Sequence, residues 1–99
     1  MKLAFTDEAF ADLRQIGDWI ASDNPRRAES FVEELIEACD ASVELLRAWR
    51  LVERYERHGV RRRTLGDYLI FFRADDTQVT ILRVLHGARD YEAILFPDG

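Results

Sequence analysis

Arginines, one histidine and one tyrosine in the second half of the chain are the side chains best suited to chemistry on an anionic ligand. Among them are Arg61, Arg63, Arg73 and Arg83, which fall in segments that read as β-strands. Their guanidinium groups could neutralise charge that develops on a phosphate, while His86 could act as an acid or base. Tyr91 could supply a second proton or stack on a base. Together these groups are the parts that cleavage of RNA through its own 2′-hydroxyl requires, with proton transfer left to His86 and Tyr91 because arginine hardly deprotonates.

Each of these side chains also has a purely structural interpretation. His86 directly precedes Gly87 at the end of a predicted strand, so we expect it to hydrogen-bond the following turn rather than to catalyse. Arg83 and Arg89 could pair with Asp90 or Glu92 in a surface network of little energetic weight. Trp19 and Trp49 are expected to pack, although an exposed Trp49 would be a candidate hot spot for a partner.

The charges are unevenly distributed along the chain, whose net charge is −5. Residues 1–46 hold 4 basic and 11 acidic residues, a balance of −7, whereas residues 47–99 hold 10 basic and 8 acidic residues, a balance of +2. Within the second half, residues 47–63 contain 7 arginines against 2 glutamates. Such a patch favours an anionic partner, either a nucleic acid or an acidic protein segment, and it also fits a solvated face with a few ion pairs.

Length and composition indicate one small domain over residues 1–99 with its own hydrophobic core. The sequence has no apolar run long enough to cross a bilayer and no signal-peptide pattern after Met1, so we expect a cytoplasmic protein that does not contact membranes. Cys39 is the only cysteine, and the histidines are His58 and His86. These residues exclude a disulfide framework and a cysteine-based zinc site, and we expect neither a metal nor another cofactor.

The first half of the chain predicts a short strand and a pair of helices. A strand over residues 2–5 is followed by Thr6, which can cap a helix that ends near residues 22–24. Its buried face is expected to contain Phe10, Leu13, Ile16, Gly17 and Ile20. Asn24 and Pro25 begin a second helix. Its expected buried face contains Ala28, Phe31, Val32, Leu35, Cys39, Ser42, Val43 and Leu46.

The second half predicts three consecutive strands. Residues 47–58 have mixed signals and remain open, whereas residues 60–65, 68–73 and 78–86 alternate or are β-branched, with Gly66 and Asp67 forming a two-residue turn. Asp90 can cap a final helical turn over residues 91–95. The fold class is therefore α+β, in the order β-α-α-β-β-β, with the helical hairpin on one face of an antiparallel sheet. We expect the other face to be open, with Arg61, Arg63, Arg73 and Arg83 flooring a shallow basic groove.

Two stretches of the sequence resemble a known family. Residues 66–73, GDYLIFFR, and residues 81–90, ILRVLHGARD, resemble the ParE branch of the RelE/ParE toxins of type II toxin-antitoxin systems, also known as plasmid stabilisation proteins. The resemblance extends to Asp23, Asn24 and Pro25 between the helices and covers nearly the whole chain. Residues 47–58 depart from it, because family members usually have a loop with proline and glycine there.

This resemblance implies a toxin that inhibits DNA gyrase, blocks replication and is neutralised by a ParD-like antitoxin, which itself supplies the contact with DNA. It implies a protein-binding inhibitor without catalytic residues or cofactors. The arginines expected to bind the antitoxin or the target are Arg61, Arg63, Arg73, Arg83 and Arg89. Two alternatives stay open. One is a RelE-like ribonuclease that cuts messenger RNA on the ribosome with His86, Tyr91 and Arg83, although Lys2 is the chain's only lysine. The other is a structural domain that keeps the fold without toxicity.

Overall fold

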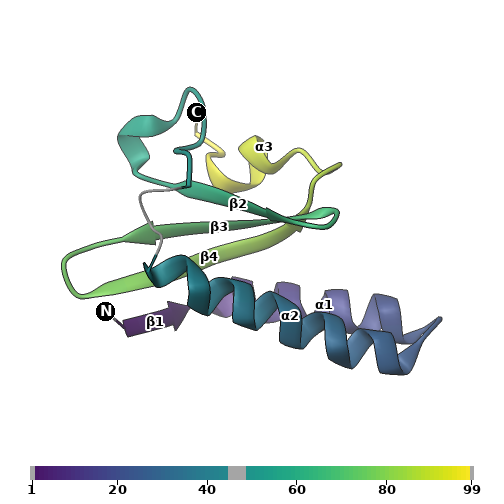
Figure 1. Ribbon diagram of the computed structural model, residues 1–99. Helices are drawn as coiled ribbons and strands as arrows, with labels where there is room; N and C mark the ends of the chain where they lie inside the picture. The colour runs from purple at the N-terminus through teal and green to yellow at the C-terminus, as the bar shows by residue number, and fades with distance from the viewer. Residues whose placement is uncertain (1, 45–48, 99) are drawn as a thin grey trace.

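The computed structural model describes residues 2–44 and 49–98 and is shown in Figure 1. Its elements follow the predicted order. They are β1 (Lys2–Phe5), α1 (Asp7–Ala21), α2 (Pro25–Glu44), a 3-10 turn (Glu56–His58), β2 (Arg61–Leu65), β3 (Tyr68–Ala74), β4 (Gln78–His86) and α3 (Tyr91–Leu95).

The four strands form one sheet in the order β1-β4-β3-β2. β2, β3 and β4 are antiparallel neighbours, while β1 pairs in parallel with residues 78–81 of β4. The predicted two-residue turn is confirmed, because Leu65 pairs with Tyr68 and Gly66 adopts a positive φ of 58°. The α+β class is therefore confirmed, and β4 lies in the interior of the sheet as its β-branched residues predict.

Side-chain caps define the helical hairpin as the sequence predicts. The hydroxyl oxygen of Thr6 accepts a hydrogen bond from the Ala9 N–H at 3.0 Å, and the Asn24 side chain accepts one from the Arg27 N–H at 3.1 Å. The hairpin packs on one face of the sheet around a hydrophobic core that includes Leu35, which is fully buried. Cys39 belongs to this core, as expected, and burial raises the pKa of its thiol to about 11. Ser42, Val43 and Leu46, also expected here, have side chains outside the described residues.

The buried stripe of α1 differs from the predicted one. Phe10 was expected to face the core, but it is 51% exposed and stacks on Phe5 at a ring-centroid distance of 5.1 Å. Leu13 and Ile16 are buried and Ile20 packs against the core, as predicted, while Ala9 and Asp12 are buried in addition. Within this stripe a carboxylate is buried, while the phenyl ring of Phe10 lies at its exposed margin.

The second face of the sheet is covered, contrary to the expectation of an open face. Figure 1 shows the helical hairpin on one side of the sheet, and the segment after residue 48 together with α3 on the other. A second core there contains Val52, Val60, Leu69, Phe71, Leu85 and Phe96. Leu51 forms a bridge with Arg61, so part of the segment whose structure the sequence left open runs along the outer edge of β2. Tyr55 stacks on Phe96 at 4.1 Å and closes this core.

None of the helices in the described part of the chain is both long enough and apolar enough to span a bilayer.

Candidate functional site

One cleft of the molecule lies where α1 replaces β1 as the neighbour of β4. β1 pairs only with residues 78–81, so the rest of β4 extends beyond it. The Thr6 N–H donates to the Ile81 carbonyl at 3.0 Å, and the Thr6 hydroxyl donates to the Leu82 carbonyl at 2.8 Å. The Val84 N–H then donates to the Asp12 carboxylate at 3.0 Å. Beyond β1, the backbone groups of β4 are thus hydrogen-bonded by Thr6, which caps α1, and by the Asp12 side chain of α1.

Asp12 and Arg83 form a two-pronged ion pair at this seam. The Arg83 Nε and Nη2 atoms donate to the two carboxylate oxygens of Asp12 at 2.7 and 2.8 Å. Asp12 is 4% exposed, and its hydrogen bonds raise the pKa of Arg83 above the ordinary value despite partial burial. The expectation that Arg83 would lie in an open groove, or pair with Asp90 or Glu92, is therefore wrong. Its partner comes from α1.

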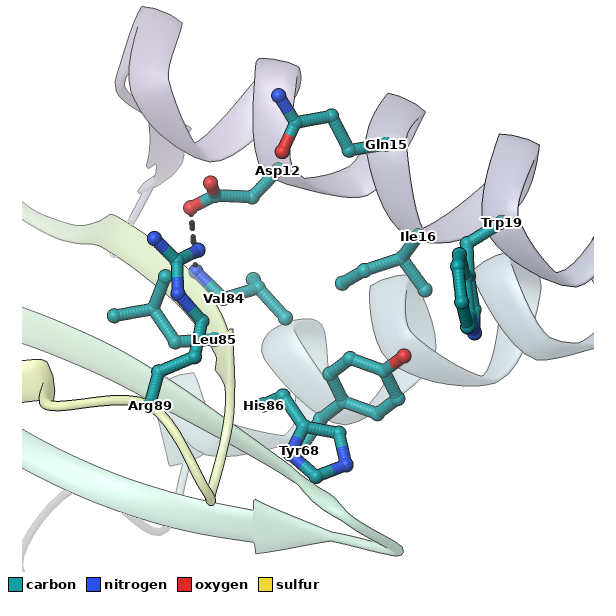
Figure 2. A pocket seen from close by; sticks show the side chains of 9 residues that line it. All are labelled: Asp12, Gln15, Ile16, Trp19, Tyr68, Val84, Leu85, His86 and Arg89. Carbon is teal, nitrogen blue, oxygen red and sulfur yellow. Dashed lines mark hydrogen bonds between the residues drawn. The ribbon is translucent and has the colours of Figure 1, made fainter.

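Beside this ion pair lies a cavity of about 460 Å³ between α1 and the end of β4. It is lined by the apolar or aromatic residues Ile16, Trp19, Tyr68, Val84 and Leu85 and by the polar residues Asp12, Gln15, His86 and Arg89. Figure 2 shows Trp19 projecting from α1 and Tyr68 from the sheet at the same opening. Trp19 is 76% exposed, so the expectation that it packs is wrong. A large exposed aromatic side chain on the wall of a cleft is typical of a contact site.

The polar rim of the α1–β4 cleft presents hydrogen-bond donors. His86 Nδ1 accepts a hydrogen bond from the Ala88 N–H at 3.0 Å, which confirms the predicted contact with the turn. Because Nδ1 accepts, the ring proton resides on Nε2. The ring also meets Tyr68 edge-on at 5.4 Å, which fixes its orientation. Arg89 is exposed and lines the same cavity.

The other predicted arginines lie elsewhere, so they do not form one groove with Arg83. Arg61 donates to the Trp49 carbonyl at 2.7 Å, and Arg63 donates to the Ala38 carbonyl of α2 at 2.8 Å. Arg63 also lies over the Trp49 ring at 4.7 Å, which keeps this tryptophan packed as predicted. Arg73 lines a separate cavity of about 350 Å³ on the second face of the sheet. A binding role for these arginines stays a prediction.

The three candidates for RNA cleavage are held by contacts in different parts of the fold. His86 contacts Tyr68 and the turn after β4. Arg83 is bound to Asp12. The Tyr91 ring packs on Phe71 at 5.1 Å, and its hydroxyl oxygen accepts from Arg62 at 3.3 Å. Within the described residues, these contacts do not assemble the three into one acid–base site.

Sequence reasoning missed Asp12 and the exposure of Trp19. A signal for Asp12 was present, because it shares a helical face with Ala9, Leu13 and Ile16, and a carboxylate within an apolar stripe needs a cationic partner. No comparable signal existed for Trp19, which continues the same face one turn further on.

Comparisons with known proteins agree with this architecture. A family model described as the ParE toxin of type II toxin-antitoxin system, parDE, matches residues 3–91. A solved chromosomal ParDE toxin-antitoxin system from P. aeruginosa has 27% sequence identity and a TM-score of 0.76, over 87% of this chain and 95% of that one. The solved RelBE2 toxin-antitoxin complex from Mycobacterium tuberculosis has 31% identity and a TM-score of 0.62, over 86% and 95% of the two chains.

No curated protein matches the sequence. The family match spans every element that forms the α1–β4 cleft, from β1 through β4 to the first residue of α3. The chain therefore belongs to the ParE family of toxins of type II toxin-antitoxin systems.

Proposed function

We propose that this toxin inhibits DNA gyrase in the bacterial cytoplasm, blocks replication and is silenced by a ParD-like antitoxin. The observation that carries the proposal is the placement of the three candidate catalytic residues in separate structural contacts. Cleavage of RNA needs a positioned acid, base and cation at one phosphate, whereas inhibition by binding needs only a complementary surface. The family match to ParE supports the same choice.

Neutralisation by an antitoxin fits the charges and surfaces of the chain. Both solved relatives carry names of toxin-antitoxin pairs. Arginines pair well with carboxylates, and an acidic segment that orders on binding would find such donors on this molecule. The net charge of −5 disfavours direct binding to DNA by the toxin, so contact with DNA is assigned to the antitoxin.

The deciding experiment is induction of the chain alone in a bacterial host with pulse-labelling of DNA and protein synthesis. Early loss of DNA synthesis with intact translation is expected. Purified toxin should then make gyrase accumulate cleaved DNA in a supercoiling assay, and added antitoxin should reverse this. Early loss of translation, or gyrase that stays fully active with excess toxin, would contradict the proposal.

The likeness to the RelBE2 complex keeps a RelE-like ribonuclease as the second candidate. In that case His86→Ala and Tyr91→Phe should abolish cleavage of message on translating ribosomes while antitoxin binding persists. Absence of cleavage by the unaltered protein on translating ribosomes would end this alternative.

A further inference from the structure

We propose that a cavity on the second face of the sheet, the second-face cavity, binds a small organic molecule that carries one carboxylate and one apolar ring. The cavity has a volume of about 350 Å³ and is lined by residues of the 3-10 turn, β3, β4 and α3 and by the residues after α3. Among the described residues, none lines both this cavity and the α1–β4 cleft. The inference goes beyond the proposed inhibition of gyrase and does not depend on it.

The apolar lining of the second-face cavity is part of a packed core. Val60 and Phe96 are buried in the core on this face of the sheet. Leu82 and Leu95 are partly buried against it. Phe96 is fixed by the stacked ring of Tyr55. A volume of roughly 300–1,000 Å³ and a pre-formed apolar lining are typical of small-molecule sites. This lining therefore suits the ring of a ligand, which would leave water on binding.

Arg73 is the lining residue best suited to hold a carboxylate. It is exposed on β3, and its guanidinium group makes one hydrogen bond within the described residues, from Nη1 to the His58 carbonyl at 3.5 Å. This distance exceeds the usual range for an N–H···O bond, so the donors of Arg73 are available to a ligand. The planar fork of a guanidinium group can donate to both oxygens of one carboxylate. Arg57 adds a second guanidinium group to the same lining.

The charges of the lining favour a single carboxylate over a doubly charged anion. Asp98 lines the cavity together with Arg57 and Arg73, so two positive charges stand against one negative charge. A monocarboxylate compensates the remaining positive charge. A phosphate dianion would bring an additional negative charge close to Asp98. The expected ligand class is therefore an apolar monocarboxylate rather than a phosphate ester.

His58 gives an independent indication that a hydrogen-bond acceptor is missing at this place. Its Nε2 atom is shielded from water and has no hydrogen-bond partner within the described residues. Buried polar atoms are nearly always paired in proteins, and an unpaired one lowers stability. The His58 ring lines the cavity and lies 4.9 Å from the Phe96 ring. When the His58 ring turns toward the cavity, a ligand oxygen there would accept the Nε2 proton in a hydrogen bond.

The test is an NMR titration of the full-length protein with phenylacetate, a probe with one ring and one carboxylate. The chain has two histidines, and only His58 lines the second-face cavity among the described residues. The ring signals of His58 should shift with a Kd of about 1 mM, as expected for a fragment of this size, while those of His86 stay in place. Phenylacetamide, which has nearly the same shape without the charge, should bind about tenfold more weakly. Inorganic phosphate should also bind more weakly than phenylacetate.

A matched pair of arginine variants tests the role of the guanidinium group. Arg73→Gln should weaken the binding of phenylacetate about tenfold, because it removes the charge and the fork. Arg62→Gln is the control, since Arg62 is exposed on β2 and does not line the cavity. It should bind phenylacetate like the unaltered protein. Urea unfolding of both variants separates a loss of binding from a loss of folding.

Three outcomes would overturn the site. The first is unchanged His58 signals at phenylacetate concentrations well above the expected Kd. The second is equal affinity for phenylacetate and phenylacetamide, or equal affinity of Arg73→Gln and Arg62→Gln for phenylacetate. The third is a shift of the His86 signals alone or together with those of His58, which would mean binding in the α1–β4 cleft or binding without a defined site. None of these outcomes bears on the inhibition of gyrase, which is tested by the labelling of DNA and protein synthesis.

Discussion

On one face of the sheet, two regular helices cover Ile70, Phe72 and Ile81; on the other, an irregular segment and a five-residue helix cover Leu69, Phe71 and Leu85. The first face is closed by side chains that recur at helical spacing. The second is closed by ring contacts, in which Phe96 stacks on Tyr55 at 4.1 Å and lies 4.9 Å from His58. The core under the helices is thus built from residues at helical spacing, whereas the core on the other face is closed by contacts between aromatic rings.

β3 connects the two faces and shows why both must be covered. Phe71 and Phe72 are adjacent and each is fully buried, although alternation along a strand points them to opposite sides. A strand with one wet face would carry a polar residue at one of the two positions. The uninterrupted run from Leu69 to Phe72 therefore requires a cover on each side, as in sheets buried on both faces.

The sharpest test of this comparison is the matched pair Phe72→Ala and Phe71→Ala. Phe72 lies in the core under the helices and Phe71 in the core under the irregular segment. Each substitution should lower the free energy of unfolding by about 3–4 kcal/mol, because each removes a large side chain from a packed interior. Urea unfolding measures both. A loss for Phe71→Ala below about 1 kcal/mol, the size of a surface effect, would mean that the second face is open in solution.

A smaller loss in the free energy of unfolding is expected when the contacts between Asp12 of α1 and β4 are removed. Asp12→Ala removes both the partner of Arg83 and the acceptor of the Val84 N–H, and should cost about 2 kcal/mol because the Arg83 side chain is partly exposed. Asp12→Asn keeps an acceptor for the N–H and should lose less. The exposed Asp18→Asn on the same helix serves as the control and should change stability little. Equal unfolding free energies for all three variants would contradict the structural role of the ion pair.

The smallest expected effect is on the rate at which a thiol reagent modifies Cys39, which lies in the core under the helices. Burial raises the pKa of this thiol to about 11, so at pH 8 almost no thiolate is present and the folded protein should resist a thiol reagent. Phe96→Ala loosens only the second face, and should leave the modification rate nearly unchanged. A rate that rises in step with the loss of stability would show instead that the two faces open as one unit.

The elements predicted correctly from the sequence are those whose signals are local. Thr6, Asn24 and the Gly66–Asp67 turn act through bonds to near neighbours, so their positions could be derived without knowledge of the fold. The apolar run from Leu69 to Phe72 indicates that the second face is covered, but the residues that cover it, such as Tyr55 and Phe96, are far apart in the sequence and follow no periodic pattern.

The candidate site was predicted in part, since His86 and Arg89 do line the cleft. Its other half comes from α1, which the charge pattern of the arginine-rich region did not indicate. Arg83 shows the reason: a cation on a strand is equally suited to a partner from outside and to a carboxylate from another element, and only the tertiary structure decides.

The bonds that Thr6 and Asp12 make to β4 also bear on how the protein avoids aggregation. Past residue 81, β4 keeps β3 on one side but no longer has β1 on the other, and an uncovered strand edge can recruit strands from other chains. Here the Ile81 and Leu82 carbonyls and the Val84 N–H are already engaged by the start of α1. The start of α1 therefore blocks this edge of β4 and satisfies its hydrogen bonds. A variant lacking Asp12 would be less stable and would also leave part of the edge free to pair with a strand of another chain.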